Sequence, residues 1–173
     1  ISTGGFSTHD NSFASFDSIN IESISILFMI IGSLPFVVYL KMTHGSLKSI
    51  FKDDQIKLFT SILLIIIIVT TFWLKINFNE NIFYSFRITA FNITSILTGT
   101  GYTSANYSIW GSFGLVIMLI IMFIGGCAGS TTGGIKIFRL QLLFRGAKTQ
   151  IKKLTHPHGV FITSFNEKSV GED

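Results

Sequence analysis

The chain has 173 residues, of which 48% are hydrophobic and 13% are charged, about half the charged share of an ordinary soluble domain. This composition excludes a soluble globular domain and predicts a membrane protein. The net charge of +4 does not indicate nucleic acid, because the basic residues flank apolar stretches, as expected beside lipid headgroups. We therefore expect a lipid bilayer as partner and no nucleic acid.

The first element in chain order is a glycine-containing segment, STGGFST at residues 2–8, which begins almost at Ile1 and has a near copy, TGTGYTS, at residues 98–104. Both copies contain a hydroxyl residue, two small residues of which the second is glycine, an aromatic residue and two more hydroxyl residues. Glycine tolerates unusual backbone dihedral angles, so such a segment can place successive carbonyls along a narrow path. This arrangement is typical of a cation selectivity filter. A chain that begins inside one copy is expected to be a piece of a longer polypeptide.

Two uncharged stretches come next, residues 23–40 and 58–74. Each is close to the ~20 residues that a helix needs to cross the hydrocarbon core, so both are predicted to be transmembrane helices. Pro35 is expected to kink the first helix near its inner end.

The third uncharged stretch, residues 88–135, is too long for one crossing. Residues 81–97 predict a short helix that enters the membrane partway, followed by the filter-like segment 99–102, a polar bend at 103–108 and a helix from Trp110 through Phe123. This order predicts a pore-loop unit, because non-helical backbone at membrane depth must line a cavity or be buried in protein. Arg87 in the short helix is costly in lipid and is expected to have a carboxylate or carbonyl partner.

A glycine-rich run at residues 125–134 interrupts the last predicted helix. Each glycine costs about 1 kcal/mol relative to alanine in a helix, so we expect a break at mid-membrane. The run comprises Gly125, Gly126, Cys127, Ala128, Gly129, Ser130, Thr131, Thr132, Gly133 and Gly134. Lys136 follows it, and either stabilises the loop by binding its carbonyls or anchors the helix at the inner surface; the sequence favours the anchor. Gly129 to Lys136 departs from a phosphate-binding loop, because the lysine is displaced and no Ser or Thr follows it.

Orientation follows from the distribution of lysine and arginine, which favour the cytoplasmic side of a membrane. The connection after the first span carries Lys41, Lys48, Lys52 and Lys57, and the tail after the last span carries Arg139, Arg145, Lys148, Lys152 and Lys153. Both segments are therefore predicted to be cytoplasmic, which places both filter-like segments near the outer face.

The segments STGGFST, SILTGTGYTSANYS and GGCAGSTTGGIKIFR together resemble the Trk/Ktr/HKT superfamily of potassium transporters, in particular its TrkH-type channel subunits. The resemblance implies an all-α polytopic membrane protein built from repeated units of helix, pore half-helix, filter loop and helix. Residues 1–41 would end the second of four pore repeats, residues 42–56 would form a cytoplasmic connection, residues 57–145 would be the complete third repeat, and residues 146–173 would be a basic cytoplasmic tail leading to the next repeat.

The resemblance also implies a set of site residues. The glycines before the aromatic residues, Gly5 and Gly101, would lie at the narrowest point of the path. The loop at 125–134 would obstruct the path until activation, with its hydroxyls and exposed carbonyls facing the permeating ion. The filter would consist of Thr3, Gly4, Gly5, Phe6, Thr98, Gly99, Thr100, Gly101 and Tyr102, with K⁺ bound by the backbone carbonyls of Thr3, Gly4, Gly5, Gly99, Thr100 and Gly101.

These features predict gated potassium translocation across the cytoplasmic (inner) membrane by the pore-forming subunit of an uptake system. It would be no enzyme, with K⁺ as the transported ion and no covalent cofactor. The resemblance implies a homodimer and a cytosolic nucleotide-binding regulatory subunit of the TrkA type as partners. Three alternatives stay open: a Na⁺-preferring or nonselective cation channel of the same superfamily, a secondary solute transporter with glycine-broken helices, and a noncatalytic membrane scaffold.

Overall fold

The fold was analysed in a computed structural model that describes residues 3–43, 53–155, 164–165 and 168–169. The expected all-α class is confirmed, with one short pair of antiparallel two-residue strands in the tail. The elements are the 3₁₀ helix η1 (Ser12–Phe16), α1 (Ile19–Ser33), α2 (Phe36–Thr43), α4 (Asp54–Phe78), α5 (Ile82–Leu97), the 3₁₀ helix η2 (Tyr107–Trp110), α6 (Gly111–Phe123), α7 (Ile137–Thr155), and the antiparallel strands β1 (Ser164–Phe165) and β2 (Lys168–Ser169). Lys48 and Lys52 of the predicted cytoplasmic connection lie outside the described residues.

Helix α4 is the one described helix that is long and apolar enough by itself to cross a membrane. Its 25 residues span about 37 Å, and it extends beyond the predicted stretch 58–74 at both ends. Asp53 caps its first turn by accepting a hydrogen bond from the amide of Gln55 at 2.8 Å. Exposed Leu64, Ile65 and Ile68 line one side of the helix, as expected for a surface in contact with lipid.

The predicted single kinked helix over residues 23–40 is wrong, because the structure has two helices there. Helices α1 and α2 are bent by 93° at their break. Proline has no N–H and its ring clashes with the preceding turn, and Leu34 before Pro35 has extended backbone, with φ −81° and ψ 155°, as the residue before a proline prefers. The break is therefore a consequence of Pro35, but it is a sharp turn rather than a kink.

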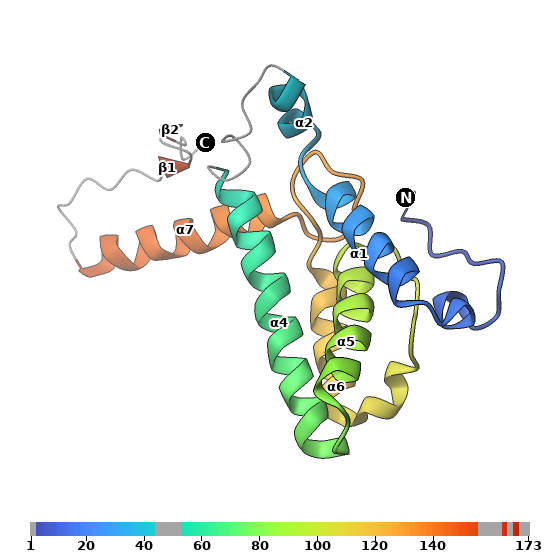
Figure 1. The fold of residues 1–173 in the computed structure, drawn as a ribbon. Coiled ribbons are helices and arrows are strands. Elements are labelled where there is room, and N and C mark those ends of the chain that lie inside the picture. The colour runs from blue at the N-terminus through green and yellow to red at the C-terminus, as the bar shows by residue number, and fades with distance from the viewer. Residues whose placement is uncertain (1–2, 44–52, 156–163, 166–167, 170–173) are drawn as a thin grey trace.

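Helices α4, α5 and α6 lie side by side, with α1 on the other side of α5 (Figure 1). Helix α5 has 16 residues, about 24 Å, which is too short to cross the bilayer. All of residues 88–95 within it are buried, so it is enclosed by its neighbours. The prediction of a pore half-helix over 81–97 is confirmed, with Asn81 accepting a hydrogen bond from the amide of Phe83 at 3.0 Å as the cap.

The predicted break in the last helix is also present. Helix α6 ends at Phe123 and α7 begins at Ile137, and the chain between them forms a loop beside the α1–α2 break (Figure 1). Ile124 and Ile135 pair at the neck of this loop as an isolated parallel bridge. Helix α7 then runs across the inner end of α4 instead of continuing α6.

Candidate ion pathway

The two glycine-containing segments meet directly. A Cβ atom added to Gly101 would lie 3.1 Å from the Cα of Gly5, and one added to Gly5 would lie 3.4 Å from the carbonyl oxygen of Thr100. The contact at Gly101 is tighter than a side chain accepts without a shift of Gly5, and the positive φ of both glycines disfavours any other residue there. The structure therefore brings together the two residues that the sequence places at the narrowest point.

Both segments have left-handed backbone at every second position. Gly99 and Gly101 have φ +68° and +80°, and in the first segment Thr3 and Gly5 have φ +51° and +69°. A left-handed residue at every second position turns successive peptide groups to the same side, which is the geometry of a carbonyl-lined path. Thr3 holds this conformation without being glycine, at a cost of roughly 1–2 kcal/mol.

The end of α5 fixes the second segment from behind. The amides of Thr100 and Gly101 both donate to the carbonyl of Ser95, at 2.8 and 3.2 Å. Because N–H and C=O point in opposite directions in a trans peptide, the carbonyls of Gly99 and Thr100 point away from α5. The negative end of the α5 dipole also lies at this point, which favours a cation.

Polar contacts on the outer side join the two repeats. The carbonyl of Thr103 accepts hydrogen bonds from the amides of Phe13 and Ala14, at 2.9 and 3.3 Å, and the ring of Phe13 lies 4.8 Å from that of Tyr102. Tyr102 is thus held by the neighbouring repeat. Phe6, the matching aromatic residue of the first segment, is 90% exposed within this chain.

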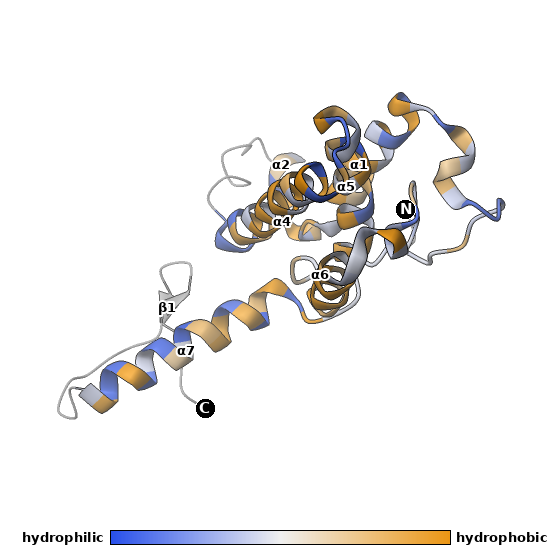
Figure 2. Ribbon diagram, turned by 90° about the horizontal axis from the view of Figure 1, so that it is seen from below, coloured by the Kyte–Doolittle hydropathy of each residue, from blue (hydrophilic) through white to orange (hydrophobic). Residues whose placement is uncertain are grey.

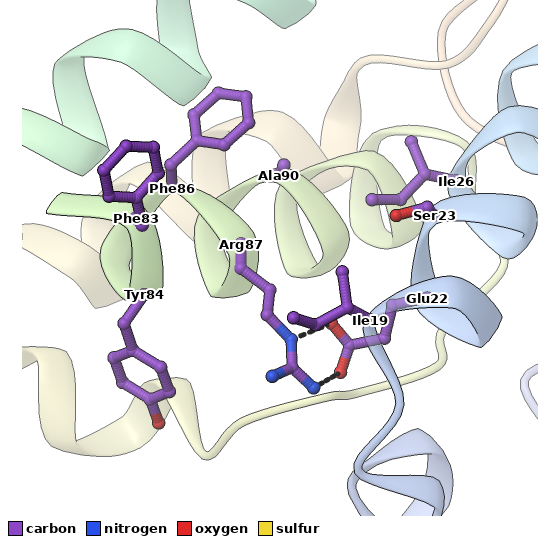
Figure 3. Close-up of a pocket in the computed structure, with 9 residues that line it drawn as sticks. All are labelled: Ile19, Glu22, Ser23, Ile26, Phe83, Tyr84, Phe86, Arg87 and Ala90. Carbon is purple, nitrogen blue, oxygen red and sulfur yellow. Dashed lines mark hydrogen bonds and ion pairs between the residues drawn. The ribbon is translucent and has the colours of Figure 1, made fainter. Parts of the chain in front are cut away.

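The expected partner of Arg87 is a carboxylate on α1. Its Nε and one Nη donate to the two carboxylate oxygens of Glu22, at 2.7 and 3.0 Å (Figure 3). Asp17 lies 3.3 Å away as a second, exposed partner. A cavity of about 420 Å³ lies beside this pair, lined mostly by apolar residues of α1 and α5. The ion pair ties the pore helix of one repeat to the final helix of the other.

The glycine-rich loop lies directly beneath both filter segments. The hydroxyl of Thr3 donates to the carbonyl of Thr131 at 3.1 Å, and a Cβ atom on Gly99 would lie 3.5 Å from the amide nitrogen of Gly133. The loop therefore contacts both glycine-containing segments.

The break between α1 and α2 holds the loop from the side. The carbonyls of Gly32 and Ser33 accept hydrogen bonds from the amides of Thr131 and Cys127, at 3.4 and 3.0 Å. The amide of Phe36 in turn donates to the carbonyl of Gly129 at 3.0 Å. A broken helix leaves such groups without partners, and here the loop of the other repeat supplies them.

The family model described as TrkH, cation transport protein, matches residues 1–173, the whole chain. The chain belongs to the TrkH family. It is accordingly part of an integral membrane protein of the cell inner membrane, in agreement with its hydropathy. It is 36% identical over 174 residues to the Trk system potassium uptake protein TrkI of Halomonas elongata, covering 100% of this chain and 35% of that protein. It is 33% identical to TrkH of Salmonella typhimurium, covering 99% of this chain and 36% of that protein.

The crystal structure of the potassium transporter TrkH from Vibrio parahaemolyticus resembles this fold with a TM-score of 0.87 and 34% sequence identity, covering 94% of this chain and 36% of that one. The TrkH-family chain thus spans about a third of the length of these relatives.

The polar side chains of the loop of this TrkH-family chain bond within the loop. The hydroxyls of Ser130 and Thr132, expected to face an ion, bond each other at 2.8 Å, and Thr132 also accepts a hydrogen bond from the amide of Gly126 at 2.9 Å. Lys136, favoured as a surface anchor, donates from Nζ to the carbonyls of Ser130, at 3.3 Å, and of Thr132. A ten-residue loop without helical bonds needs internal partners at membrane depth, and these side chains provide them.

Two supporting residues were missed in the sequence. Asn92, fully buried on α5, exchanges hydrogen bonds with Ser104: its Nδ2 donates to the hydroxyl at 3.1 Å and its Oδ1 accepts from the amide at 3.3 Å. Gln55 on α4 accepts from the amide of Ala128 in the loop at 3.0 Å. An amide residue in an otherwise apolar short helix was the available signal for Asn92; Gln55 gave none, because its helix and the loop are distant in the sequence.

Proposed function

We propose that this chain forms half of a four-repeat pathway for K⁺, in the pore-forming subunit of a potassium uptake system. One observation carries the proposal: two segments with left-handed backbone at every second position meet at Gly5 and Gly101, where a Cβ atom on Gly101 would lie only 3.1 Å from the Cα of Gly5. Carbonyls of such segments can replace the hydration shell of a cation. We assign the ion-binding carbonyls to Thr3, Gly4 and Gly5 and to Gly99, Thr100 and Gly101.

The names of the relatives favour potassium as the ion, because TrkI and TrkH are both described as Trk system potassium uptake proteins. The close approach of the two glycine-containing segments argues against passage of an organic solute. A Na⁺-preferring or nonselective cation pathway stays as the second candidate. In the proposed four-repeat pathway, discrimination between K⁺ and Na⁺ depends on four filter segments, and this chain holds two of them.

The experiment is uptake of K⁺ and Na⁺ into proteoliposomes by the full-length protein. In Gly101→Ser, the new Cβ atom would lie 3.1 Å from the Cα of Gly5, and serine would have to adopt the φ of +80° that Gly101 has. We therefore expect the K⁺/Na⁺ uptake ratio to fall. Gly146→Ser in α7, where a Cβ meets nothing within 4 Å, is the matched control and keeps the ratio. A folded Gly101→Ser protein with the wild-type ratio contradicts the filter assignment, whereas Na⁺ uptake equal to or above K⁺ uptake in the wild type supports the second candidate.

We further propose that the loop at 125–134 closes the inner end of this pathway and that Lys136 stabilises the closed form. Its contacts to Ser130 and Thr132, and the contact of Thr131 with Thr3, support this assignment. In this proposal, the subunit works as a homodimer, and a cytosolic nucleotide-binding subunit of the TrkA type acts on the loop from the cytoplasmic side.

A further inference from the structure

Helix α7 has its polar and apolar sides reversed relative to a helix that packs on its own protein. Its polar side contacts α4: Gln141 Nε2 donates to the backbone carbonyl of Asp54, and Arg145 donates to the Asp54 carboxylate, both at 2.8 Å. The apolar side packs against the core only at Leu140, and from Leu143 onward it is exposed in the described part of the protein. Figure 2 shows α7 extending away from α4, α5 and α6 with hydrophilic and hydrophobic residues alternating along it.

The apolar residues form one continuous stripe. They recur three or four positions apart, which places them on one face about 100° wide, and they are Leu140, Leu143, Phe144, Ala147, Ile151 and Leu154. Leu143, Phe144, Ile151 and Leu154 are between 62% and 82% exposed. An exposed stripe of this kind in a membrane protein indicates a further apolar environment that covers it.

Charge identifies what covers the stripe. Basic residues occupy the rest of the helix circumference, namely Arg139, Arg145, Lys148, Lys152 and Lys153, and α7 contains no Asp or Glu. Two copies of this helix that paired through their stripes would bring these like charges together. Anionic lipid headgroups, by contrast, neutralise them while the acyl chains receive the apolar side chains.

Position agrees with this choice. Arg145 is bonded to Asp54, the first residue of α4, so the middle of α7 lies at the cytoplasmic end of the transmembrane helix. From there α7 runs across the direction of α4 (Figure 1), and its last ten residues extend about 15 Å. A helix that leaves the end of a transmembrane span sideways lies along the membrane surface.

We propose that α7 is an interfacial helix that binds the inner leaflet, with its apolar stripe among the acyl chains and its lysines on anionic phospholipid headgroups. This places a membrane-surface contact immediately after the glycine-rich loop, since Ile137 is the first residue of α7 and its amide donates to the carbonyl of Gly126 at 3.1 Å. The proposal does not depend on which ion passes.

The test uses the full-length protein without its native cysteines, in nanodiscs of phosphatidylglycerol and phosphatidylcholine, with no other protein present. A polarity-sensitive dye is attached to Ala147→Cys, in the middle of the stripe, or to Thr149→Cys, on the polar face, both of which replace a small residue. We expect the dye at 147 to be blue-shifted and quenched by spin-labelled acyl chains, and the dye at 149 to be quenched by iodide in water. In pure phosphatidylcholine, or with Lys148, Lys152 and Lys153 all changed to Gln, the blue shift at 147 is lost.

Two results would overturn the proposal. Iodide that reaches position 147 as readily as position 149 in anionic nanodiscs shows that the stripe is not in lipid. Protection at 147 that is independent of lipid charge, together with disulfide cross-linking between two copies of the unlabelled Ala147→Cys variant, assigns the stripe to a second copy of the chain. Neither readout uses transport, so a failure here is distinct from a failure of the proposed potassium pathway.

Discussion

Replacing Lys136 with methionine should raise the basal flux of the full-length protein. The ammonium donates to the carbonyls of Ser130 and Thr132 and lies 3.2 Å from the Thr132 hydroxyl. Methionine is an unbranched side chain one atom shorter than lysine and has no donor. Hydrogen bonds that involve a charged group contribute about 1.5–3 kcal/mol. These bonds exist in the closed loop, so their loss changes the ratio of open to closed loop by their full value.

Taking about 2 kcal/mol for the lost bonds, the open fraction of a mostly closed population rises roughly 30-fold. The assay is ⁸⁶Rb⁺ uptake into proteoliposomes that contain the full-length protein and no regulatory subunit. Lys75→Met, at an exposed position in the last turn of α4, is the matched control and should leave the basal flux unchanged. Lys136→Arg retains the charge and should recover most of the low flux.

A Lys136→Met protein that melts at the wild-type temperature and shows equal or lower basal flux would refute the assignment of Lys136 to the closed loop. A loss of stability alone does not imitate the expected rise, because unfolded protein provides no pathway and so lowers the total flux. Normalising the uptake to folded protein, measured by size-exclusion chromatography, separates the two effects.

Three further changes test the same structure. Gly125→Ala places a Cβ 2.0 Å from the carbonyl oxygen of Gly133, so it should abolish the folded peak in chromatography, whereas Gly133→Ala, which meets nothing within 4 Å, should retain it. Arg87→Met leaves the Glu22 carboxylate charged and 4% exposed, so it should lower the free energy of unfolding by about 3–5 kcal/mol. The double variant Arg87→Met/Glu22→Gln should recover part of this loss. Equal thermal unfolding of the single and double variants would contradict the pairing. Thr131→Val removes a hydrogen bond of 3.1 Å to the α1 carbonyl of Gly32, worth about 1 kcal/mol, and should raise basal flux roughly fivefold; unchanged flux would show that this contact does not hold the loop.

Local signals were sufficient for most of the fold. Charge-free length predicted α4, the short interrupted pattern before Thr98 predicted α5, and the glycine run predicted the break before α7. Each of these features depends on residues close together in the sequence. The cost of burying a charge, or of placing glycine in a helix, can therefore be judged from the local sequence alone. Arg87 could be assigned a carboxylate or carbonyl partner by the same energetic argument, but Glu22 could not be chosen, because it lies far away in the sequence.

The errors arose where backbone groups are satisfied by distant residues. Pro35 indicated a kink, whereas the bend is 93° and the backbone groups at the break bond to a loop that is distant in the sequence. Lys136 was favoured as an anchor because basic residues commonly mark the inner surface, whereas the loop carbonyls that attract its ammonium become available only once the chain is folded. Sequence pattern identified the loop residues but not the bonds among them.

The two breaks in this structure depend on each other. The loop supplies the partners for Gly32, Ser33 and Phe36 at the end of α1 and the start of α2, and these groups in turn hold Thr131, Cys127 and Gly129. Moving the loop alone would leave the buried backbone groups of Ser33 and Cys127 unpaired, at about 1–3 kcal/mol for each group. In the proposed gate, opening therefore requires either that water enters the break or that α2 moves with the loop. Since α2 leads toward the cytoplasmic connection and α7 begins directly after the loop, a force applied at the inner surface to either helix reaches the same set of hydrogen bonds.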